Sequence, residues 1–227
     1  MNAPPFVTCR GVTLALAAIL ALGPAWADEP PAQATPLFDG KTFAGWDGDT
    51  RETWRIEDGC LVGGTLAKKQ PRNEFLATNK EYGDFVLTLQ FKLLGDPKKG
   101  FVNSGVQVRS QRVQDSHEMI GYQADLGDGF WGSIYDESRR NKVLAAADQE
   151  AMHKALKPGA WNAYVVRAEG RRMRTWLNGV AGADYTEPDE RIPQVGRIGL
   201  QIHGGGPAEV RFKDLAIEEL PLKRRGE

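Results

Sequence analysis

Alternating apolar and polar residues run through much of the chain, and this period constrains the fold more strongly than any other feature. Between Asp84 and Leu93, each odd position from Phe85 onward is Phe or Leu, and most even positions are polar. Successive side chains of a β-strand leave opposite faces of a sheet, so this period predicts a strand with one buried face. The same period recurs in two further segments, with Val106 and Val108 in one and Ile198, Leu200 and Ile202 in the other. We therefore expect a protein built from β-strands.

Local signals also mark a turn and a bulge between strands. Asn178-Gly179 follows a strand-like segment, and this pair is typical of a tight hairpin turn. Near the C-terminus, the apolar residues Val210 and Phe212 follow the two-residue period. The next apolar residue in the pattern, Leu215, is shifted by one position from that period. This slip predicts a β-bulge at Lys213-Asp214.

Helical signals are confined to one short segment, Asp148–Leu156. Asp148 is the expected N-cap, and Pro158-Gly159 is the expected stop. Many strands, frequent glycine turns and a single short helix predict an all-β fold in which two antiparallel sheets form a sandwich. One face of each sheet is then core, and the other face of at least one sheet is free to bind a ligand.

The N-terminal residues have the pattern of a secretory signal peptide. Arg10 supplies a positive charge, Val12–Leu22 is an apolar run about half as long as a bilayer span, and Ala25-Trp26-Ala27 offers small residues before a cleavage site. We expect a periplasmic or secreted protein without a membrane span. The expected organisation is a signal peptide at 1–27, a Pro-rich tether at 28–36 and one β-sandwich domain at 37–222.

Charge and cysteine content exclude several classes of function. The chain has 29 Lys and Arg and 30 Asp and Glu, a formal net charge of −1, and the two signs are mixed along it. A mixed, nearly neutral chain is a poor partner for nucleic acid. After cleavage only Cys60 remains, so no intramolecular disulfide can form, and its apolar neighbours favour a buried thiol over a nucleophile.

The stretch 121–144 is rich in amides, carboxylates, aromatic rings and arginines, and it has no period that a core would require. Gln123 and Asp125 lie two apart, so on a strand both side chains leave one face. Trp131 and Tyr135 follow in a glycine-rich loop. Flat rings and paired polar groups are what a protein offers a sugar, although the two rings could equally plug one end of the sandwich.

Other predicted strands also carry polar residues at the positions that alternate with their apolar residues. If one sheet face is free, we expect six side chains to converge on it: Gln107, Arg109, Gln123, Asp125, Gln201 and His203. Arg109 could instead form an ion pair within the protein, and His203 could be a structural histidine whose hydrogen bonds are all made within the protein. The glycines at 204–206 after His203 would let backbone approach a ligand closely.

Five motifs in order along the chain resemble the 3-keto-disaccharide hydrolase family. They are Leu37-Phe38-Asp39-Gly40-Lys41 with Gly45-Trp46, Trp54 with Glu57-Asp58-Gly59, Asn103-Ser104-Gly105-Val106-Gln107-Val108-Arg109, Trp161-Asn162 with Leu177-Asn178-Gly179, and Gly199-Leu200-Gln201-Ile202-His203-Gly204. The resemblance spans about residues 37–220. It implies a concanavalin A-like jelly roll and an enzyme that cleaves glycosides whose sugar is oxidised at carbon 3. Many members carry Glu-x-Gln where this chain has Gln123 and Asp125, so the carboxylate differs in position.

The implied chemistry needs few catalytic groups. A ketone at carbon 3 makes the carbon 2 proton acidic, so the bond at carbon 1 can break by elimination, after which water adds. One base is required, together with stabilisation of the enolate oxygen and a proton for the leaving group. We expect Asp125 or, second, Glu137 as the base, Arg109 as an oxyanion or hydroxyl clamp, and His203 as acid, base or metal ligand. The expected substrate-binding residues are Asn103, Gln107, Gln123, Trp131, Tyr135 and Gln201.

Several alternatives remain open at the level of sequence. No cofactor is required, but Asp125, Glu137 and His203 could gather around a divalent metal ion. The same sandwich fold supports non-catalytic carbohydrate-binding modules, and an ordinary glycosidase with two carboxylates is a further possibility. For the elimination, a separate sugar 3-dehydrogenase would have to make the ketone.

Overall fold

The computed structural model describes residues 33–221. The predicted signal peptide at 1–27, the first part of the predicted tether and the last residue of the predicted domain, 222, lie outside this range. Within it, strand β1 (Thr35–Pro36) pairs with strand β15 (Ala208–Glu219). Sheet pairing therefore begins at the end of the predicted tether, just before Leu37.

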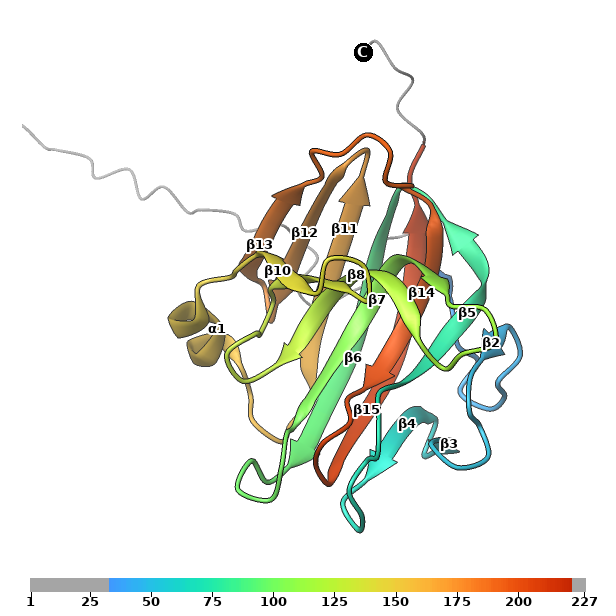
Figure 1. Ribbon diagram of the computed structural model, residues 1–227, viewed down its shortest axis with the longest axis vertical. Coiled ribbons are helices and arrows are strands. Elements are labelled where there is room, and N and C mark those ends of the chain that lie inside the picture. The colour runs from blue at the N-terminus through green and yellow to red at the C-terminus, as the bar shows by residue number, and fades with distance from the viewer. Residues whose placement is uncertain (1–32, 222–227) are drawn as a thin grey trace, which may run out of the picture.

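Fifteen strands of the described chain form two antiparallel sheets that lie face to face (Figure 1). The eight-stranded sheet has the order β13 (Val180–Thr186), β12 (Arg172–Leu177), β11 (Asn162–Glu169), β6 (Phe85–Gly95), β15, β4 (Cys60–Thr65) and β3 (Trp54–Glu57), with β1 beside β15. The seven-stranded sheet has the order β10 (Lys142–Ala145), β9 (Ile134–Glu137), β8 (Met119–Gly127), β7 (Asn103–Arg112), β14 (Gly196–Ile202), β5 (Glu74–Tyr82) and β2 (Trp46–Asp47). This arrangement confirms the predicted all-β sandwich.

A single large core fills the space between the sheets, and the alternating segments supply it. The eight-stranded sheet contributes Phe85, Leu87, Leu89 and Phe91, and the seven-stranded sheet contributes Val106, Val108, Ile198, Leu200 and Ile202. Full burial of one such side chain stabilises the fold by roughly 1.5–3 kcal/mol. Burial of these alternate positions fixes the register of each strand, and it decides which residues face outward.

The predicted turn, bulge and helix are all present. Asn178 and Gly179 have φ values of 47° and 81°, as a two-residue hairpin turn requires. The pairing of β15 with β6 shifts between Lys213 and Ala216, which confirms the bulge. Helix α1 (Gln149–Ala155) lies beside β13 at one edge of the eight-stranded sheet (Figure 1). None of the helical residues within 33–221 forms a segment long and apolar enough to cross a membrane.

The N-cap of α1 gives a first testable prediction. Asp148 Oδ1 accepts hydrogen bonds from the backbone N–H groups of Glu150 at 3.0 Å and Ala151 at 3.2 Å. Replacing Asp148 with alanine leaves both donors without this partner, so we expect a loss of about 1 kcal/mol in the free energy of unfolding, measured by urea denaturation. Asp148→Asn keeps an accepting oxygen and should lose far less; an equal loss in both variants would contradict the capping role.

Candidate active site

Polar side chains gather on the outer face of the seven-stranded sheet, the face turned away from the core. Strand register defines two neighbouring rows on this face. One row runs through Gln201, Gly105 and Asp125, and the next runs through Gly199, Gln107, Gln123 and Tyr135. Four of the six residues predicted to share a face, Gln107, Gln123, Asp125 and Gln201, therefore do so, and Tyr135 joins them.

Two glycines keep this face clear for longer side chains. A Cβ atom on Gly105 would lie 2.5 Å from the amide carbon of Gln123, and one on Gly199 would lie 2.6 Å from the sulfur of Met119. Both contacts are far closer than van der Waals distance, so any larger residue would displace these side chains. The glycines allow Gln123 and Met119 to lie across neighbouring strands.

The floor of the site is a chain of hydrogen bonds that ends at a carboxyl group. Ser110 Oγ donates to Gln107 Oε1 at 2.6 Å, Gln107 Nε2 donates to Gln123 Oε1 at 2.8 Å, and Gln123 Nε2 donates to Asp125 Oδ1 at 2.6 Å. All four side chains are buried, and Asp125 is only 4% exposed. The carboxyl group of Asp125 is thus held in place and largely withdrawn from water.

Burial changes the acidity of Asp125 and of its neighbour Glu137. Removal from water raises the pKa of Asp125 to about 7; the hydrogen bond from Gln123 opposes this rise, and the charge of Glu137 adds to it. Burial also raises the pKa of Glu137 to about 7, and the charge of Glu118 raises it further. Near neutral pH, this pair can therefore supply one ionised carboxylate as a base and one protonated carboxyl group as an acid.

Gln201 connects its own row to Glu137 and has a side-chain oxygen that accepts no hydrogen bond. Its Nε2 donates to Glu137 Oε2 at 3.3 Å, while its Oε1 is buried without a hydrogen-bond partner. A buried acceptor without a partner costs free energy, and a ligand hydroxyl group can satisfy it. The hydroxyl group of Tyr135 lies on the same face, and its raised pKa, caused first by burial and then by Glu137 and Asp125, keeps it protonated as a donor.

Arg109 does not lie on this face, which corrects its predicted position. Its φ is 50°, and the pairing of β7 with β8 shifts between Val108 and Gln111, so a bulge reverses the alternation there. The side chain is fully buried and forms an ion pair with Asp84 at 2.6 Å. It also donates to the backbone oxygens of Gly83 and Gly170. Arg109 thus joins parts of the scaffold, and it is not placed to act as an oxyanion clamp.

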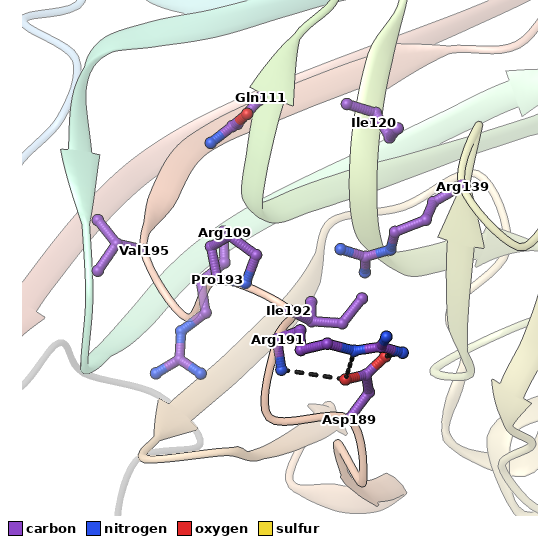
Figure 2. A pocket seen from close by; sticks show the side chains of 9 residues that line it. All are labelled: Arg109, Gln111, Ile120, Arg139, Asp189, Arg191, Ile192, Pro193 and Val195. Atoms are coloured by element: carbon purple, nitrogen blue, oxygen red, sulfur yellow. Dashed lines mark hydrogen bonds and ion pairs between the residues drawn. The ribbon is translucent and has the colours of Figure 1, made fainter.

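Arg109 also lines a pocket of about 480 Å³ at this end of β7 and β8. Figure 2 shows the side chains that surround it. Asp189 and Arg191 form an ion pair at 2.9 Å on one side of it (Figure 2). Arg139, which also lines the pocket, forms an ion pair with Asp136 at 2.8 Å. The charges around this pocket are thus neutralised within the protein. Asp125 and Glu137 do not line this pocket, so the candidate catalytic groups lie elsewhere.

Trp131 likewise lies away from the polar face. It is 8% exposed, belongs to the core and stacks on Phe91 with ring centroids 6.1 Å apart. Of the two interpretations that the sequence left open for this ring, packing at one end of the sandwich is the one the structure shows. Trp131 is therefore not placed to stack on a sugar bound beside Asp125.

His203 and Asn103 lie opposite each other just beyond the row of Gln201. The backbone N–H of His203 donates to the backbone oxygen of Asn103 at 3.2 Å. His203 Nδ1 lies 2.6 Å from the backbone oxygen of Gly204, so this nitrogen carries a proton, and the ring packs edge-on against Phe101. A catalytic role for His203 and substrate binding by Asn103 stay predictions.

The metal hypothesis finds no support in the arrangement of ligands. Among residues 33–221, no three His, Cys, Asp or Glu side chains lie close enough together to hold a metal ion. Asp125, Glu137 and His203 therefore do not form the cluster that was considered. No step of the chemistry below depends on a metal.

The sequence did not indicate two groups that shape this site. Glu118 is half-buried, and its charge raises the pKa of Glu137. Ser110 follows the bulge at Arg109, so its orientation cannot be read from alternation. Antiparallel pairing of β8 with β9, in which Gly121 opposes Glu137, is the signal that could have placed Glu118 near Glu137.

Comparison with known proteins extends these observations. A family model described as "3-keto-alpha-glucoside-1,2-lyase-like domain" matches residues 33–218. No protein with a curated description matches the sequence. Many solved structures match the fold, among them the following three, each with low sequence identity.

The first is a protein from Parabacteroides distasonis with a provisional assignment as a glycosyl hydrolase; the identity is 23%, the match covers 82% of this chain and 99% of that one, and the TM-score is 0.61. The carbohydrate binding module CBM66 from Bacillus subtilis is 16% identical, with 77% and 96% coverage and a TM-score of 0.57. A β-glucanase from Bacillus licheniformis is 9% identical, with 85% and 100% coverage and a TM-score of 0.53. These similarities show that the jelly-roll sandwich is shared, and they do not assign an activity.

Proposed function

The chain belongs to the family of 3-keto-alpha-glucoside-1,2-lyase-like domains, and on this premise we propose that it cleaves 3-keto-glycosides by proton abstraction at carbon 2, elimination at carbon 1 and hydration. The observation that carries the proposal is the pair of buried carboxyl groups, Asp125 and Glu137, each with a pKa raised to about 7. An elimination followed by hydration requires one base and one acid that are active at the same pH.

In the first step, ionised Asp125 takes the proton from carbon 2, and the electrons of that bond move toward the ketone oxygen. The resulting enolate expels the group at carbon 1 as its C–O bond breaks, and protonated Glu137 gives a proton to the departing oxygen. Water then adds to carbon 1 of the unsaturated ketone, and carbon 2 regains a proton. The sum of the steps is hydrolysis of the glycosidic bond.

Arg109 forms an ion pair with Asp84 and is not placed to bind the substrate. Two neutral side chains can take over the support of this chemistry. The hydroxyl group of Tyr135 is a donor that can stabilise the enolate oxygen. Gln201 Oε1, which is buried without a partner, can accept a hydrogen bond from a hydroxyl group of the sugar. A donor and an acceptor fixed on one sheet face would orient the ring with carbon 2 toward Asp125.

Two further expectations belong to the same proposal. Residues 1–27 have the pattern of a signal peptide, which supports action in the periplasm or outside the cell. The substrate carries a ketone that this site does not make, so a separate sugar 3-dehydrogenase would have to supply it.

A non-catalytic carbohydrate-binding module is the second candidate, because the fold is shared with CBM66. A binding module has no need for acidic groups that titrate near pH 7, and their burial costs stability. The carboxyl pair therefore favours an enzyme. An ordinary two-carboxylate glycosidase remains the enzymatic alternative.

A comparison of two substrates tests the proposal. The mature protein is incubated with a 3-keto-glucoside that carries a chromogenic leaving group, and with the matching unoxidised glucoside. We expect release from the keto form alone. Release from the unoxidised glucoside would support the ordinary glycosidase, and binding of glycans without release from either substrate would support the binding module.

The pH dependence of kcat/KM gives the second testable prediction. Asp125 must lose its proton to act as the base, so the rate should fall below about pH 7; Glu137 must keep its proton to act as the acid, so the rate should fall above about pH 7. We expect a narrow bell-shaped profile centred near neutrality. Glu137→Gln should lose the alkaline limb, and a flat wild-type profile from mildly acidic to mildly alkaline pH would contradict the assignment.

A further inference from the structure

The amide groups of Gln107 and Gln123 are used within the protein. Gln107 Nε2 donates to Gln123 Oε1 at 2.8 Å, and Gln123 Nε2 donates to Asp125 Oδ1 at 2.6 Å. Both side chains are buried. The sequence had suggested substrate contact for these residues, but their mutual hydrogen bonds indicate a different task.

The chain of hydrogen bonds has one direction. It starts at Ser110 Oγ, which lies 2.6 Å from Gln107 Oε1 and 3.1 Å from the backbone oxygens of Val108 and Tyr122. Each amide then accepts at its oxygen and donates at its nitrogen, so every donor points toward Asp125. Hydrogen bonds arranged head to tail polarise one another, and each strengthens the next.

Building on the proposed function, we propose that Ser110, Gln107 and Gln123 form a one-directional hydrogen-bond relay that orients the carboxyl group of the base, Asp125. Ser110 and Gln107 are then positioning residues that do not touch substrate. The relay holds Oδ1 of Asp125 and takes no part in binding Oδ2, which is the oxygen left for the reaction.

The direction of the relay also selects a protonation state. An ionised carboxylate only accepts hydrogen bonds, so it matches the Nε2 group that Gln123 presents. If the amide of Gln123 were turned round, its oxygen would face Asp125, and only a protonated carboxyl group could pair with it. The donor from Gln107 to Gln123 Oε1 opposes that reversal, so the relay stabilises the basic form of Asp125 against burial.

Other groups near Asp125 stay constant when the relay is changed. Glu137 and Tyr135 act on it from β9, and the hydroxyl group of Tyr164 on β11 lies 3.4 Å from its backbone oxygen. None of these three residues bonds with Ser110 or Gln107 in the described contacts. A change in the titration of Asp125 after substitution of the relay can therefore be assigned to the relay.

The test is a titration of Asp125 followed by ¹³C NMR of its carboxyl carbon, with Asp125→Asn to assign the signal. Gln107→Met keeps a similar volume but removes the donor to Gln123, so we expect the pKa of Asp125 to rise by about 0.5 to 1. Ser110→Ala should cause a smaller rise. Ser104→Ala is the matched control: this serine of β7 is also buried, but its hydroxyl group donates to the backbone oxygen of Gln201 and lies outside the relay.

Unchanged titration of Asp125 in both Gln107→Met and Ser110→Ala would overturn the relay. If Gln107→Met does not fold, Ser110→Ala compared with Ser104→Ala decides alone. The titration needs no substrate, so failure to cleave a 3-keto-glucoside would refute the proposed function without deciding the relay. Conversely, cleavage together with an unchanged titration would refute the relay alone.

Discussion

Asp125→Asn is expected to lower kcat/KM on a 3-keto-glucoside by roughly 10²–10⁴-fold, because removal of a general base has this effect. The substitution keeps the size of the side chain and an oxygen that can accept from Gln123 Nε2, so the floor of the site should persist. The rate of leaving-group release under single-turnover conditions is the measurement. It reports the chemical step directly and does not depend on release of the sugar.

A nearby aspartate offers a matched control for this substitution. Asp128 lies three residues further along the chain, and its side chain is 85% exposed and paired with His153 at 2.8 Å. Asp128→Asn should leave the rate within a few-fold of wild type. If Asp125→Asn were as active as Asp128→Asn while Glu137→Gln was inactive, Glu137 would be the base and the assignment of Asp125 would be wrong.

Arg109→Met is expected to destabilise the fold by about 3–5 kcal/mol, the usual effect of removing one partner from a buried ion pair. Asp84 would keep a buried carboxylate that has lost its cation and retains only the backbone N–H of Gly170 at 3.0 Å as a donor. Three backbone and side-chain acceptors of Arg109 would also lose their donor. Urea denaturation at neutral pH measures the loss.

Two comparisons separate this structural role from a catalytic one. Arg172→Met breaks an exposed ion pair with Asp184 and should cost at most about 1 kcal/mol. Asp84→Leu combined with Arg109→Met should recover part of the stability, because no unpaired charge remains. If Arg109→Met were as stable as wild type but had lost the activity of the folded enzyme, the originally predicted clamp would be correct and the scaffold role would be wrong.

Alternation in the sequence was sufficient to predict most of the fold. The placement of every second residue of β6, β7 and β14 in the core follows from the two-residue period, and the slip at Lys213 correctly located a bulge. The five ordered motifs led to the family that the match over residues 33–218 confirms. These features are local in the chain, so local patterns can reveal them.

The composition of the site was harder to predict because it depends on contacts between distant strands. A second bulge at Arg109 has no slip in hydrophobic period to reveal it, and it turns this side chain toward Asp84. For Trp131, the sequence could not distinguish a ring in a binding loop from a ring that closes the core. Glu118 approaches Glu137 only through the register of β8 with β9. Alternation along each strand predicted which residues share a face. It could not predict which of these side chains form hydrogen bonds with one another.

The central claim is that Asp125 removes the proton from carbon 2, and isotope labelling tests it most directly. A 3-keto-glucoside with deuterium at carbon 2 is cleaved in ordinary water, the reaction is stopped early with borohydride to prevent later exchange, and mass spectrometry measures deuterium in the released sugar. An enzyme-free incubation of the labelled product corrects for spontaneous exchange. The account predicts that release of the leaving group is accompanied by loss of the label. A released sugar that retains all of its deuterium, together with leaving-group release that the label does not slow, would show that the glycosidic bond breaks without abstraction at carbon 2 and would contradict the account.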